Sequence, residues 1–133
     1  MRWSLCVFYK QKDKQMRLRI LVKEWFDKWE KGDFLHLPIS ENFKHISPFG
    51  TINGKTQYLK VVEANKDKFL GYHFEIHDEI YDRGKACVRY TASQGDFTLD
   101  VSEWHFVKKD LIETIVSYYH IGEIPDTRKL SNL

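Results

Sequence analysis

Apolar residues in the first part of the chain recur at helical spacing between residues 16 and 31. Lysines and acidic residues occupy the opposite side of this segment, which is the pattern of a helix with one buried face. Gly32 follows and supplies a C-terminal stop. The pattern therefore predicts a helix over residues 16–31, with a buried face formed by Leu18, Leu21, Val22, Trp25, Phe26 and Trp29.

A second helical pattern and a short strand follow. Residues 43–47 alternate, so that Phe43, His45 and Ser47 share one face of a predicted strand. Residues 55–69 return to helical spacing. The buried side of this second helix is predicted to contain Tyr58, Val61, Val62 and Phe69.

The rest of the chain alternates between apolar and polar residues in four runs. The runs cover residues 73–81, 86–93, 97–107 and 111–121. Short segments with turn-forming residues separate them, which is typical of strands joined by hairpins. Helices therefore come first and a four-strand meander comes last, which predicts an α+β domain with the helices on one face of a curved antiparallel sheet.

The two ends of the chain differ from the middle. The apolar run 3–9 precedes a Lys/Gln/Asp run where a signal peptide would need small residues, and Met16 is a second plausible start. We expect residues 1–15 to form an N-terminal arm, either a short extra strand or a segment packed on the body. The domain would then cover residues 16–122, and residues 123–133 would be a loose polar tail.

Composition narrows the class of protein. Aromatic residues make up 15% of the 133 residues, and the net charge is only +2. The first value excludes a disordered chain, and the second gives no reason to expect nucleic acid as a partner. No apolar run approaches the ~18 residues of a membrane span. Two cysteines are too few for a disulfide framework, so we expect a compact cytoplasmic domain.

Metal and cofactor motifs are weak. His73 and His77 have a spacing that suits a metal ion on a helix, but their segment alternates like a strand. Four residues of strand span roughly 13 Å, which is too far for one ion. We therefore predict neither a metal site nor a cofactor.

Several polar residues occur within predicted strands that are otherwise apolar. They are His45, Ser47, Arg89, Glu103, His105, Tyr118 and His120. A sheet with one solvated face would produce the same alternation. Grouped with Trp25, Trp29 and Tyr58, these residues instead predict an apolar pocket with a few polar groups, which is typical of a site for a small organic molecule.

The order of elements resembles a known superfamily. A helix with Trp29 leads to Gly32-Asp33-Phe34, a strand ends in His45-Ile-Ser-Pro-Phe-Gly50, and a helix beginning Asn53-Gly54-Lys55 precedes the meander. This order, over residues 16–122, resembles the nuclear transport factor 2-like (NTF2-like) superfamily, above all its SnoaL-like polyketide cyclase and ketosteroid isomerase branch. The resemblance implies a cone-shaped curved sheet around a pocket, and homodimers formed through the sheet.

The resemblance also implies roles for individual residues. Trp25 stands where ketosteroid isomerases carry an oxyanion-hole tyrosine, and Ser47 stands where they place the catalytic aspartate. Glu103 aligns with a second oxyanion-hole acid, for which a raised pKa would allow hydrogen-bond donation. Tyr118 and His120 resemble the closing segment of cyclases, with His120 in place of an acidic residue.

Two functions follow as hypotheses. In the first, the protein is an acid/base enzyme of the isomerase, cyclase, dehydratase or hydrolase type. His45 or His120 would transfer the proton, Glu103 would orient the substrate, and Arg89 would pair with Glu103 or with an anionic ligand. In the second, the same pocket serves a non-catalytic ligand-binding or dimerisation module, which the serine at position 47 favours. The ligand-contacting set would be Trp25, Trp29, Ser47, Tyr58, Arg89, His105 and Tyr118.

Overall fold

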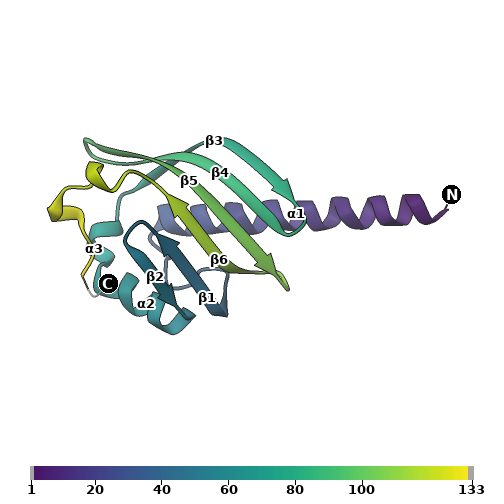
Figure 1. Ribbon diagram of the computed structural model, residues 1–133, viewed down its shortest axis with the longest axis horizontal. Helices are drawn as coiled ribbons and strands as arrows, with labels where there is room; N and C mark the ends of the chain where they lie inside the picture. The colour runs from purple at the N-terminus through teal and green to yellow at the C-terminus, as the bar shows by residue number, and fades with distance from the viewer. Residues whose placement is uncertain (1, 132–133) are drawn as a thin grey trace.

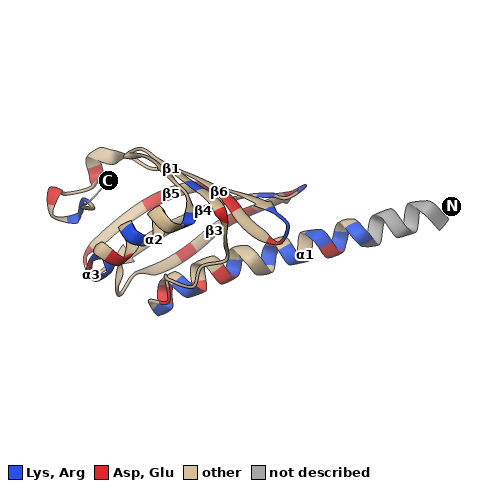
Figure 2. Ribbon diagram, turned by 90° about the horizontal axis from the view of Figure 1, so that it is seen from below, with Lys and Arg blue, Asp and Glu red and all other residues tan. Residues whose placement is uncertain are grey.

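A six-stranded sheet curves around the helices, which all lie on its concave face (Figures 1 and 2). The computed structural model describes the backbone of residues 2–131 and the side chains of residues 10–131. The helices are α1 (Arg2–Lys31), α2 (Lys55–Ala64) and α3 (Lys66–Phe69), with short 3-10 helices η1 (Ile121–Glu123) and η2 (Asp126–Arg128). The strands are β1 (Ile39–Ser47), β2 (Gly50–Asn53), β3 (His73–Asp82), β4 (Lys85–Gln94), β5 (Phe97–Lys108) and β6 (Leu111–Tyr118).

The sheet confirms the α+β prediction and adds one parallel pair. Strands β3 to β6 form the predicted antiparallel meander, and the full order is β2-β1-β6-β5-β4-β3. Strand β1 runs parallel to β6, with His45 opposite Ile115. Residues 50–53, between the predicted strand and the second predicted helix, form β2 and pair with β1. The sheet is therefore mixed, and β1 brings His45 beside the end of the meander.

Helix α1 confirms the predicted buried face but is longer than expected. Leu18, Val22, Trp25, Phe26 and Trp29 are all buried against the sheet. The helix continues back to Arg2, so the prediction of an extra strand within residues 1–15 is wrong for the described residues. No glycine or proline interrupts this segment, and therefore nothing in the sequence stops the helix from extending. Figure 1 shows its N-terminal part projecting beyond the sheet.

The second predicted helix breaks at Asn65. The Asn65 amide donates to the Val61 carbonyl at 2.7 Å and to the Ser131 carbonyl at 3.0 Å. The Ser131 N–H returns a bond to Asn65 Oδ1 at 2.8 Å. An asparagine side chain that bonds to backbone groups competes with the helical pattern, which explains the break between α2 and α3. The same bonds hold the C-terminal segment against α3, so the prediction of a loose tail is wrong for residues 123–131.

The two faces of the sheet differ in burial. Val88, Tyr90, Val101 and Ile115 face the helices and are buried, and Phe26 meets Tyr90 at a ring distance of 5.0 Å. Alternate residues face outward, away from the helices. No helix within residues 2–131 is both long and apolar enough to cross a membrane.

Candidate functional site

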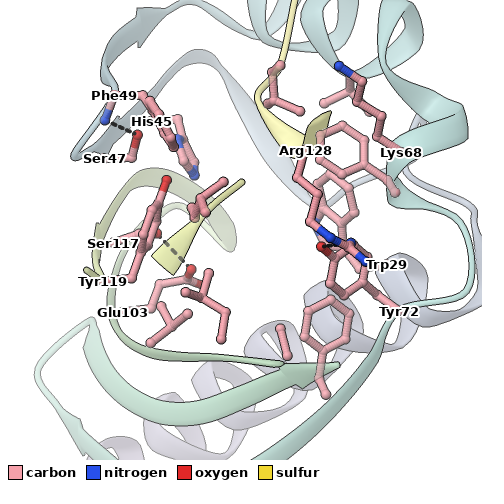
Figure 3. Close-up of a pocket in the computed structure, with 18 of the residues that line it drawn as sticks. Trp29, His45, Ser47, Phe49, Lys68, Tyr72, Glu103, Ser117, Tyr119 and Arg128 are labelled. Atoms are coloured by element: carbon pink, nitrogen blue, oxygen red, sulfur yellow. Dashed lines mark hydrogen bonds between the residues drawn. The ribbon is translucent and has the colours of Figure 1, made fainter. Parts of the chain in front are cut away.

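A cavity of about 230 Å³ lies between the helices and the concave face of the sheet (Figure 3). Most of its wall is aromatic or aliphatic. The aromatic lining consists of Trp25, Phe26, Trp29, Phe49, Tyr58, Phe69, Tyr72, Phe74, Tyr90, Phe97 and Tyr119. A few polar groups interrupt this wall: His45, Ser47, Lys68, Glu103, Ser117 and Arg128. An apolar cavity with a few convergent polar groups is the usual form of a site for a small organic ligand.

Glu103 is the only carboxylate among the described residues that line this cavity. Strand β5 points it inward, and Glu103 Oε2 accepts hydrogen bonds from the Tyr90 and Ser117 hydroxyls, both at 2.8 Å. His105 Nε2 lies 2.9 Å from Oε1, close enough for an ion pair although not in hydrogen-bond alignment. Three neighbours from three strands therefore hold this carboxylate in one orientation.

The charge state of Glu103 differs from the expectation. Burial raises the pKa of this carboxyl, but the His105 side chain and the Ser117 and Tyr90 hydroxyls outweigh burial and hold the pKa below its ordinary value. The prediction of a raised pKa is therefore wrong. Glu103 is an ionised acceptor at neutral pH, not a hydrogen-bond donor.

His45 reaches the cavity from β1. Its ring packs on Tyr58 with centroids 5.2 Å apart, and Figure 3 shows it pointing into the cavity. Neither ring nitrogen has a hydrogen-bond partner among the described residues. Burial lowers the pKa of His45, a nearby His105 lowers it further, and Glu103 opposes this shift only in part. His45 is therefore a neutral imidazole at neutral pH, free to accept a proton.

Ser47 and Tyr119 lie on the same side of the cavity as His45 (Figure 3). The Ser47 hydroxyl accepts a hydrogen bond from the Phe49 N–H at 3.2 Å. Burial raises the pKa of the Tyr119 phenol, although Ser47 lowers it and Glu103 raises it slightly. Tyr119 therefore stays protonated and can donate a hydrogen bond to a ligand oxygen.

The predicted aromatic contacts Trp25, Trp29 and Tyr58 all line the cavity. Trp25 and Trp29 meet edge to face at 5.7 Å. The Trp29 indole N–H is buried without a hydrogen-bond partner among the described residues. The phenol of Tyr58 is buried, which raises its pKa well above the ordinary value and keeps it neutral.

Four predicted site residues lie elsewhere. Arg89 faces outward and pairs with Asp78 at 2.6 Å, so its predicted pairing with Glu103 is wrong. His105 is fully buried behind Glu103 and is absent from the lining.

The other two predicted site residues that lie outside the cavity are Tyr118 and His120. Tyr118 is 60% exposed. His120 follows the end of β6, where its Nδ1 accepts the Gly122 N–H at 3.1 Å, outside the cavity. Buried Ile115 fixes the inward face of β6, and period-two alternation then sends Ser117 inward and Tyr118 outward.

The sequence reading missed several lining residues. Ser117 could have been found, because it alternates with Ile115 on the buried face of the last strand, and Tyr119 continues this alternation one residue beyond the end of the strand. Lys68 and Arg128 carry no such signal, because α3 and η2 are short and polar. Within the described part of the chain, no group of three His, Cys, Asp or Glu side chains is arranged to hold a metal ion.

Comparisons with known proteins identify the architecture. No family model and no curated protein matches the sequence. Among solved structures, an NTF2-like protein of unknown function from Cytophaga hutchinsonii is 21% identical, with a TM-score of 0.67 over 77% of this chain and 89% of that one. The chain has the NTF2-like fold.

Two further neighbours with the NTF2-like architecture match the predicted branch. A proposed ketosteroid isomerase from Kribbella flavida is 18% identical, with a TM-score of 0.67 over 84% of this chain and 83% of that one. A SnoaL-like protein of unknown function from Burkholderia thailandensis is 19% identical, with a TM-score of 0.67 over 80% and 96%. The predicted resemblance to this superfamily is confirmed at the level of fold.

Proposed function

We propose that this protein binds a small, mostly apolar organic molecule in its cone cavity and moves a proton on that molecule through His45. The observation that carries the proposal is the His45 imidazole, which has no hydrogen-bond partner among the described residues and faces an apolar cavity with Glu103 as the one carboxylate of its described lining. A ketosteroid isomerase-like neighbour makes proton transfer on an apolar substrate a natural chemistry for this fold.

Each polar group has a distinct part in such a reaction. His45 takes a proton from the substrate, and the nearby negative charge of Glu103 stabilises the imidazolium that forms. The Tyr119 phenol, protonated at neutral pH, donates a hydrogen bond to an oxygen that gains negative charge. The aromatic wall excludes water and strengthens both interactions.

A second candidate is a ligand-binding protein without turnover. Ser47 occupies the place that the resemblance gives to an aspartate base, and its hydroxyl already accepts the Phe49 N–H. Glu103 is likewise engaged by three protein groups. This arrangement favours a receptor in which His45 only hydrogen-bonds the ligand.

The same experiment tests both candidates. Cyclic ketones, enones and epoxides of about ten heavy atoms would be incubated with the protein, with binding followed by calorimetry and product by mass spectrometry. Enzymatic action predicts turnover that falls at least about 100-fold in His45→Gln, with binding retained. His120→Gln is the matched control, because His120 lies outside the cavity, and it should keep full turnover. Binding without turnover would favour the receptor, and no binding at all would contradict both.

We propose in addition that the outer face of the sheet forms a homodimer. Ile80, Trp104 and Phe106 remain exposed there, and Trp104 and Phe106 stack with ring centroids 6.3 Å apart. Large apolar side chains gathered on one face are typical of a protein interface. A second copy would cover them and leave the concave cavity free for its ligand.

A further inference from the structure

The C-terminal segment forms part of the wall at one end of the cavity, which we call the outer end. Residues 124–130 contribute Ile124, Arg128 and Leu130 to the lining, and all three are half-buried. Bonds between Ser131 and Asn65 anchor the end of this segment to the helices. The segment is thus part of the cavity wall, and the chemistry of its side chains bears on the ligand.

Two cations lie at this outer end, Lys68 from α3 and Arg128 from η2 (Figure 3). Within the described residues, neither has a carboxylate within ion-pair distance. The Arg128 guanidinium instead contacts neutral groups: it donates to the Gln94 side chain and to the Tyr72 hydroxyl, and it lies 4.1 Å from the centre of the Phe97 ring. The Lys68 ammonium donates to the Lys129 carbonyl.

Both half-buried cations have only neutral partners among the described residues. Partial removal of a charge from water is unfavourable, and proteins normally compensate with an opposite charge. The nearby exposed Lys129, by contrast, pairs with Asp126 at 2.8 Å. Among the described residues, no group supplies a negative charge to Lys68 or Arg128, whereas a ligand in the cavity could.

The single carboxylate of the lining lies far from these cations. Strand β5 begins with Phe97, under Arg128, and reaches Glu103 six positions later. Six strand residues span roughly 20 Å, so the cavity is positive at its outer end and negative at its inner end. Phe97, Leu99 and Val101 provide the apolar stretch between them. A ligand with one acidic group would therefore enter in a single orientation, with its charge outward.

From these charges we infer that the ligand is an organic carboxylate or a similar oxyanion with an apolar body. Lys68 and Arg128 hold its negative group, the aromatic wall encloses its body, and its far end points toward His45 and Glu103. This inference rests on the proposed small-molecule function and adds the chemical class of the ligand. It also requires the reacting atom to be remote from the acidic group, because Glu103 repels an anion.

A pair of probes with the same body and different charge tests the inference. We would titrate 2-naphthoate and its neutral analogue 2-naphthamide into the full chain by calorimetry at low ionic strength. We expect naphthoate to bind about tenfold or more tightly than naphthamide, which corresponds to one charge-assisted contact. The advantage should shrink in about 0.5 M salt, because salt screens a half-exposed charge pair.

Variants of the two cations distinguish an effect of their charge from an effect on the structure of the cavity wall. In Lys68→Gln and Arg128→Gln, naphthoate should lose about three- to tenfold in affinity while naphthamide is unchanged. Lys66→Gln is the matched control, since Lys66 belongs to the same helix but is absent from the lining, and it should change neither affinity.

Each alternative outcome has one meaning. Equal affinity for the two probes in the wild-type protein would overturn the inference and leave the proposed function intact. An equal loss for both probes in the two variants would also overturn it, because the cations would then only support the wall. Binding of neither probe by the wild-type protein would contradict the proposed function together with the inference.

Discussion

Two pairs of ionisable side chains lie on opposite faces of the same sheet and differ in their surroundings. Glu103 and His105 face the helices, and their side chains are 5% and 0% exposed. Asp78 and Arg89 face outward, with side chains 62% and 54% exposed. The outer pair has the shorter contact, 2.6 Å against 2.9 Å. The shorter contact is nonetheless the weaker one, because water screens it while the interior does not.

Stability alone does not explain why Glu103 and His105 are buried next to each other. Removing two polar groups from water is so unfavourable that a well-packed apolar pair would be as stable or more so. Glu103 is nevertheless supported from three sides, by His105, Tyr90 and Ser117. A precisely held carboxylate in the wall of an apolar cavity is what a ligand site needs. The buried pair is therefore retained for the cavity, whereas the exposed pair only lies on a solvated face.

The largest predicted effect is the loss of the buried carboxylate. Glu103→Ala leaves the Tyr90 and Ser117 hydroxyls without their acceptor and removes the carboxylate beside the buried His105. We expect the free energy of unfolding to fall by about 3–5 kcal/mol, measured by urea denaturation. Glu103→Gln should lose less, because the amide oxygen still accepts from both hydroxyls. A loss below about 1 kcal/mol for Glu103→Ala would show that this network is not held as tightly as the distances indicate.

Acid should lower the free energy of unfolding through ionisable groups on the concave face of the sheet. The pKa of His45 lies below its ordinary 6.5 and that of Glu103 below its ordinary 4.5. In both cases the unfolded chain binds protons more readily than the folded protein. The free energy of unfolding should therefore decrease as the pH falls below about 6.5, and decrease again as it falls below about 4.5.

Urea denaturation from neutral pH down to about pH 4 measures these two steps. His45→Gln should remove the first step and keep the second. Arg89→Ala should keep both, because Arg89 faces away from the cavity. A first step that persists in His45→Gln would mean that another group titrates there.

A substitution on the outer face of the sheet should change the oligomeric state of the protein rather than its stability. Trp104→Lys places a charge in the centre of the proposed interface. We expect the wild-type protein to be a dimer by light scattering, and this variant to be a monomer that still binds ligand in the cavity. The stability of the monomer should change by no more than about 0.5 kcal/mol, because Trp104 contributes little to the core. A monomeric wild-type protein at micromolar concentration would contradict the dimer.

Strand alternation explains how much of the site the sequence could reveal. His45 and Ser47 alternate with Phe43, and Glu103 and His105 alternate with Val101, so their shared inward faces were predictable. Alternation shows which residues share a face, but not which face is inward. In the last strand, the buried Ile115 marks the inward face, which includes Ser117 and leaves Tyr118 exposed.

Contacts between distant segments account for what the sequence could not show. The parallel pairing of β1 with β6 joins segments about 70 residues apart, as His45 opposite Ile115 illustrates. The C-terminal segment is held by Asn65 and Gln94, which local patterns cannot connect to it. The lowered pKa of Glu103 likewise depends on partners from other strands. Sequence patterns therefore predicted an α+β domain with a curved sheet and several of the residues that line the cavity, while the charges of the cavity required the structure.

The smallest predicted effect is the loss of the outer pair. In Arg89→Ala, Asp78 remains well exposed, so water replaces the lost guanidinium. We expect the free energy of unfolding to fall by less than about 1 kcal/mol, and the difference from wild type to vanish at high salt. Ligand binding and its pH dependence should be unchanged. A loss comparable to that of Glu103→Ala would mean that the outer face is covered in solution, and a concentration series would then show whether a second copy is what covers it, since dissociation would remove the effect.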